Sequence, residues 1–136
     1  MRVTLILALL ALASPTCLSR EPSQLTASLI SRSQAVIVAE FRDNPRVDLR
    51  SGNIYVIENF DVKATLAGEF SDSSISVHIT RTLDDEPHPF KAGERLILFV
   101  KKVPNALPPW ELTDDDFGIQ PYTHGLESSI KQLVAR

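Results

Sequence analysis

The sequence predicts a mainly β protein, a small barrel of five or six strands with one helix at each end. Two short runs, 35–39 and 96–100, consist only of apolar residues, which predicts strands with both faces buried. Two further segments, 54–66 and 75–79, alternate between apolar and polar residues, as half-buried strands do. Because apolar residues recur at helical spacing near both chain ends, the terminal helices are expected to cover the outside of the sheet.

Residues 1–19 have the layout of a secretory signal peptide and are set apart from the folded domain. Arg2 is followed by an apolar stretch from Val3 to Ala13 and then by small residues. That stretch is too short to span a bilayer, which takes about 20 apolar residues. We therefore expect residues 20–136 to form one exported domain, secreted or periplasmic, without a transmembrane segment.

Charge and cysteine content narrow the class of protein. The formal net charge is −3, and the signal segment contributes only the positive Arg2, so the exported domain is acidic. An acidic domain argues against binding to nucleic acid, whose phosphates require a positive field. Cys17 is the only cysteine, so no disulfide can form within the chain. Three fates of Cys17 stay open: removal with the signal peptide, lipidation, or exposure as a free N-terminal residue.

The first two predicted elements of the domain are a helix and a strand. A short amphipathic helix is predicted from about Ser23 to Ser31, where apolar residues form a narrow stripe. The apolar run 35–39, extended by Phe41, predicts the first strand. Asp43-Asn44-Pro45 is expected to end that strand, and the polar stretch to Gly52-Asn53 is expected to form a loop.

The middle of the chain predicts two alternating strands. Ile54–Leu66 is long for one strand at thirteen residues, and Glu58 is the one polar residue on its apolar phase. A buried carboxylate is costly, so a bend or bulge at Glu58-Asn59 is expected to swing that side chain outward. Ser74–Arg81 alternates cleanly and places His78 on its outward phase.

Leu96–Val100 is the predicted central strand, after a turn at Gly93-Glu94. Leu96, Leu98 and Val100 are expected on one face, and Ile97 and Phe99 on the other.

The remaining elements are shorter. Two strands are predicted at Trp110–Leu112 and Phe117–Ile119, around a turn formed by Asp114–Asp116. A C-terminal helix is predicted after Thr123 as its N-cap, with apolar residues at helical spacing up to Val134.

Several segments between residues 33 and 120 follow a familiar order: Ser33–Glu40, Tyr55–Gly68, Ile75–Val77, Phe90–Phe99, Trp110–Leu112 and Phe117-Gly118. In this order they resemble the netrin-like and TIMP-like (tissue inhibitor of metalloproteinases) OB-fold domains, above all small secreted proteins of uncharacterised function with that fold. The resemblance implies an OB-like (TIMP-like) barrel. Ala39 and Ala67-Gly68 depart from the family pattern, which commonly has glycine and Lys-Gly there.

No catalytic, cofactor-binding or metal-binding motif stands out. His78, His88 and His124 lack the spacing of metal ligands, and the chain has no glycine-rich phosphate loop. The acidic runs 84–86 and 114–116 are interpreted as solvated turns rather than calcium sites. We therefore expect a protein that is not an enzyme and holds no metal or cofactor.

We expect a binding module that recognises a protein or another extracytoplasmic ligand. Its candidate surface combines an acidic loop with two aromatic side chains of the kind enriched at interfaces: Asp84, Asp85, Glu86, His88, Trp110 and Tyr122. Burial of Trp110 in the core is the alternative interpretation.

Two other functions stay open. One is a metalloproteinase inhibitor, although the resemblance implies an N-terminal cysteine held by a disulfide, and a chain with one cysteine cannot form that bond within itself. The other is an extracytoplasmic hydrolase with a site assembled from His78, His88 and acids on different loops.

The signal-peptide hypothesis predicts the N-terminus of the exported protein. N-terminal sequencing of protein recovered from outside the cytoplasm is expected to start between Ser14 and Glu21. A cytosolic protein that still begins with Met1 would contradict the hypothesis.

Overall fold

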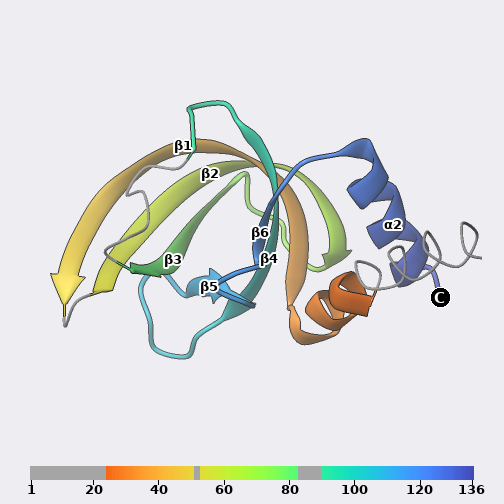
Figure 1. Cartoon of the computed structure of the whole chain (residues 1–136), viewed down its shortest axis with the longest axis horizontal. Helices are drawn as coiled ribbons and strands as arrows, with labels where there is room; N and C mark the ends of the chain where they lie inside the picture. The colour runs from red at the N-terminus through yellow and green to blue at the C-terminus, as the bar shows by residue number, and fades with distance from the viewer. Residues whose placement is uncertain (1–23, 51–52, 83–89) are drawn as a thin grey trace, which may run out of the picture.

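The computed structural model describes residues 24–50, 53–82 and 90–136, without the side chains of 44–50, 53–54 and 81–82. The elements in chain order are helix α1 (24–32), β1 (Ala35–Arg50), β2 (Asn53–Gly68), β3 (Ser74–Thr82), β4 (Arg95–Lys102), β5 (Trp110–Leu112), β6 (Ile119–Pro121) and helix α2 (His124–Val134) (Figure 1). The fold is mainly β with two flanking helices, as predicted.

Five strands close into a barrel. The sheet order is β1-β2-β3-β5-β4-β6, and an additional pairing of β1 with β4 joins the two sides. β3 and β5 run parallel, while the other pairs are antiparallel. This is an OB-like barrel, with β6 as an extra strand beside β4.

β4 is the central strand of the structure. Its residues Leu96–Val100 are all completely buried. Leu96, Leu98 and Val100 belong to the core inside the barrel, whereas Ile97 and Phe99 belong to a second core on its outer side. The predicted alternation of this strand is confirmed.

The second core lies beneath the two helices. α1 contributes Leu29 and α2 contributes Ile130, both completely buried with Ile97 and Phe99. Figure 1 shows α1 (orange) and α2 (blue) on the same side of the barrel. The Thr123 hydroxyl accepts the amide of Leu126 at 3.0 Å, which confirms the predicted N-cap of α2.

The prediction that β1 ends at Asp43-Asn44-Pro45 is wrong, because the strand continues to Arg50. Its register with β2 shifts between Phe41 and Asp43 and again between Asp43 and Arg46. Pro45 therefore lies in a bulge, where its missing amide hydrogen removes no ladder bond. β1 and β2 continue as a long curved ribbon through residues that were expected to form a loop (Figure 1).

The prediction that Glu58 swings outward is also wrong. Glu58 is 0 % exposed and shares its side of β2 with the buried Val56 and Phe60. The ladder between β2 and β3 stays regular through this point, with Glu58 opposite Val77. Near Glu58 the irregularity lies instead on β1, the strand that contains proline, so β2 alternates from Val56 to Phe60 and Glu58 stays inside.

The two short strands do not form a pair around the acidic turn. Both pair with β4, and the second begins at Ile119 rather than Phe117. The amide of Phe99 donates to the Gly118 carbonyl, and its carbonyl accepts the amide of Thr113, each at 2.8 Å. The segments before and after residues 114–117 thus both lie along β4, and residues 114–117 form a loop that projects away from it.

A close backbone approach requires glycine where this excursion ends. A Cβ atom on Gly118 would lie 2.4 Å from the carbonyl oxygen of Asp114. Glycine there lets its amide donate to that same oxygen at 2.8 Å.

Candidate functional site

The structure separates the two aromatic residues of the predicted surface. Trp110 lies opposite Lys102 at the end of β4, and the amide of Tyr122 donates to Arg95 at its start. Arg95 and Lys102 are the first and last residues of the eight-residue strand β4, so they lie roughly 23 Å apart at about 3.3 Å for each step from one residue to the next. The other four predicted residues, Asp84, Asp85, Glu86 and His88, lie outside the described part of the chain.

Trp110 opens β5 at one end of the barrel and is half-buried. One part of the ring packs against the core inside the barrel, which is the role that the alternative interpretation gave it. Its ring meets that of Phe70 edge-on, with centroids 5.3 Å apart. The ammonium of Lys102 lies 5.3 Å from the Trp110 centroid, within the range of a cation–π interaction. Trp110 is therefore both a core residue and part of the surface.

A hollow of about 450 Å³ adjoins this tryptophan. It is lined by Gln34, by residues 68–72 of the hairpin between β2 and β3, and by Lys102 and Trp110. The residue before β1, the hairpin between β2 and β3, and both ends of the loop between β4 and β5 thus meet at one end of the barrel.

Backbone contacts hold these segments together. Gly68 has φ +72°, and a Cβ atom there would lie 2.0 Å from the carbonyl oxygen of Gln34, so only glycine fits. The amide of Gln34 donates to the Val100 carbonyl at 2.9 Å, and its side-chain oxygen accepts the amide of Lys102. The start of β1, the end of β2 and the end of β4 are thus held together at this point.

The loop between β4 and β5 adds an exposed apolar side chain. Leu107 is 90 % exposed, on a loop that connects two lining residues of the hollow, Lys102 and Trp110. The base of the loop is closed where the amide of Val103 donates to the Pro109 carbonyl at 2.7 Å. We call Glu69, Phe70, Asp72, Lys102, Leu107 and Trp110 the rim.

The charges of the rim are distributed unevenly. The carboxylates of Glu69 and Asp72 make no hydrogen bond or ion pair with the described residues. Elsewhere, Glu40 pairs with Arg95 at 2.9 Å and Glu111 with Lys101 at 3.4 Å. Two carboxylates of the rim thus have no cation among the described residues as a partner, whereas the ammonium of Lys102 lies at the face of Trp110.

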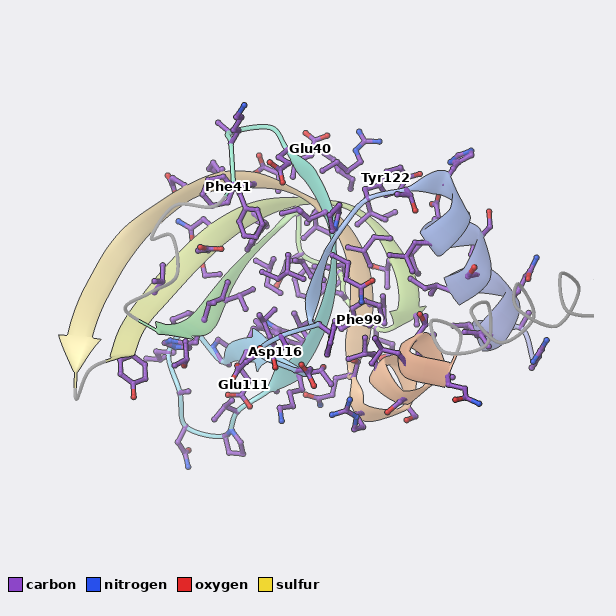
Figure 2. The ribbon with its side chains drawn as sticks, in the orientation of Figure 1. Glu40, Phe41, Phe99, Glu111, Asp116 and Tyr122 are labelled. Atoms are coloured by element: carbon purple, nitrogen blue, oxygen red, sulfur yellow. The ribbon has the colours of Figure 1, made fainter. Side chains whose placement is uncertain are left out.

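Tyr122 anchors α2 to the barrel rather than standing free on the surface. The half-buried ring lies between the barrel and α2 and packs on the outer core (Figure 2). Its hydroxyl donates to Glu127 at 2.6 Å. The pKa of Glu127 is lowered, chiefly by this hydrogen bond and further by Lys131, 3.5 Å away. The same hydrogen bond raises the pKa of Tyr122. The guanidinium of Arg95 lies 5.6 Å from the ring centroid.

Of the two histidines in the hydrolase alternative, the structure describes His78, whereas His88 lies outside the described residues. His78 pairs with Ile57 across the ladder and lies beside Glu111, whereas Glu58 points to the other face of β2. Among the described residues, no group of three or more histidine, cysteine, aspartate or glutamate side chains is arranged to hold a metal ion. None of the helices in the described part of the chain is long and apolar enough to cross a membrane.

Comparison of the sequence with known proteins identifies no relative of this chain. No family model matches the chain, and a search of the curated proteins finds no similar one. The geometry of the rim is therefore the basis on which a function is proposed.

The contact between Tyr122 and Glu127 predicts a loss of stability in acid. The lowered pKa of Glu127 stabilises the fold above its usual value near 4.5, and this contribution is lost as the pH falls through the folded pKa. Tyr122→Phe removes the main cause, so the free energy of unfolding should depend less on pH below about 4.5. Urea titrations at a series of pH values measure this.

The control is Tyr55→Phe, since Tyr55 is the only other tyrosine and is 40 % exposed. Equal pH dependence in the wild type and Tyr122→Phe would contradict the assignment.

Proposed function

We propose that this chain is an exported, non-enzymatic binding module that contacts an extracytoplasmic protein through the rim. The observation that carries the proposal is the 90 % exposure of Leu107 on a loop that begins and ends at the hollow. Leu107 precedes the half-buried Trp110 by three residues, so one loop carries an exposed apolar side chain and ends at an aromatic residue of a type enriched at interfaces.

The rim lies at a place where OB-type barrels bind ligands. OB-type barrels bind ligands with the loop between strands 4 and 5 among their contact loops, and Leu107 lies on that loop. The residue types of the rim are also those of a protein interface, which combines apolar and aromatic anchors with charges at its edge. Fold alone does not assign the function, so the proposal depends on these particular side chains.

Export rests on the layout of residues 1–19. The OB-like strand order supports our further proposal that the chain is related to the netrin-like and TIMP-like domains. The partner is expected to be a protein rather than nucleic acid, because the chain is acidic overall.

Leu107→Asp tests the proposal without touching the core. Residues 20–136 are immobilised and exposed to the extracytoplasmic fraction of the source cells, and the retained protein is identified, purified and titrated against each variant. We expect Leu107→Asp to weaken binding at least about tenfold, because a charge replaces an apolar anchor. Its urea midpoint should equal that of the wild type.

Phe117→Asp is the matched control, since Phe117 is 47 % exposed on a different loop. It should bind as the wild type does. Equal affinity of the Leu107→Asp variant, or the absence of any specifically retained protein, would refute the rim as the binding surface.

A further inference from the structure

The hollow of the rim combines two kinds of group that bind cations. Phe70 and Trp110 contribute aromatic rings, whose faces attract positive charge. Glu69 and Asp72 contribute carboxylates that no described cation neutralises. An incoming basic group would therefore meet both a ring and a carboxylate in one hollow.

Lys102 shows that this tryptophan already attracts a cation. Its ammonium lies 5.3 Å from the Trp110 centroid and forms no ion pair with Glu69 or Asp72. Among the described residues that line the hollow, two side chains are negatively charged and one is positively charged, and the positive one is held at the ring. The charge that a partner must supply to complement the hollow is positive.

We propose that the hollow receives a lysine or arginine side chain of the partner protein, an inference that rests on the function proposed above. The aliphatic stem of such a side chain packs on the two rings while its charged end reaches Glu69 and Asp72. A segment of protein is the occupant rather than a free amine, because Leu107 offers an apolar contact to neighbouring residues that a small cation would leave unused.

Lys102 then acts as a competitor for the face of Trp110. Replacement by methionine keeps a flexible, apolar side chain and removes the ammonium. The proposal predicts that Lys102→Met strengthens binding of a basic side chain. A gain of this kind cannot arise from a damaged fold, so it separates recognition from stability.

The single tryptophan of the chain makes the test direct, because intrinsic tryptophan fluorescence then reports on the hollow alone. The probe is the peptide acetyl-Gly-Arg-Gly-amide, and the control replaces arginine with citrulline, which has a similar shape and no charge. We expect a saturable change in Trp110 emission in the millimolar range with the arginine peptide. The citrulline peptide should bind at least about tenfold more weakly.

Variants define the site. Glu69→Gln with Asp72→Asn should weaken the arginine peptide about fivefold or more, whereas Asp115→Asn with Asp116→Asn, on the other acidic turn, should leave it unchanged. Lys102→Met should tighten it severalfold. Equal binding of the two peptides, or no effect of the Glu69→Gln and Asp72→Asn pair, would overturn the proposal.

The two proposals fail in different ways. If the purified partner depends on Leu107 but binds the Glu69→Gln and Asp72→Asn pair as tightly as wild type, the basic side chain is refuted and the binding module stands. If the arginine peptide binds while Leu107→Asp leaves the partner unaffected, docking of a protein segment at the hollow is refuted.

Discussion

The burial of β4 on both faces determines where the two hydrophobic cores and the two helices lie. Leu98 fills the barrel while its neighbour Phe99 faces the helices, so one strand belongs to two cores. Pairing of β4 with β1 closes the barrel, and pairing with β5 and β6 occupies its other edge. An apolar outer face of this kind must be covered, which is why both terminal helices pack on the same side of the barrel.

The sequence predicted those features that depend on local pattern. An unbroken apolar run indicates a strand with two buried faces, and Thr123 before a helical repeat indicates a cap, whatever the rest of the chain does. The course of β1 depends instead on its partner, because pairing with β2 carries the strand past Pro45 through a bulge. Glu58 is inside for the same reason, since the irregularity nearest to it fell on β1 and left the alternation of β2 intact from Val56 to Phe60. Farther along β2, shifts at Lys63 and Leu66 break the predicted alternation, so Leu66 joins the outer core.

The rim was only partly predictable. Trp110 was identified by its residue type, but Lys102 joins it through the pairing of β4 with β5, and Phe70 joins it from a hairpin that is distant in sequence. No periodicity brings such segments together. Leu107 carried a weak signal, an apolar residue in a proline-rich loop, which is consistent with exposure at a contact surface. Tyr122 shows the reverse case, because an aromatic residue expected at an interface fastens α2 to the barrel.

Chemical unfolding of Leu98→Ala and Phe99→Ala tests whether both faces of β4 are buried, because these neighbours lie in different cores. The account predicts that both variants lose free energy of unfolding, by about 2–5 kcal/mol for Leu98→Ala and about 3–5 kcal/mol for Phe99→Ala. Phe117→Ala, at an exposed position, should change it by only about 0.5 kcal/mol. A loss below about 1 kcal/mol at either Leu98 or Phe99 would mean that one face of β4 is not buried and would contradict the account.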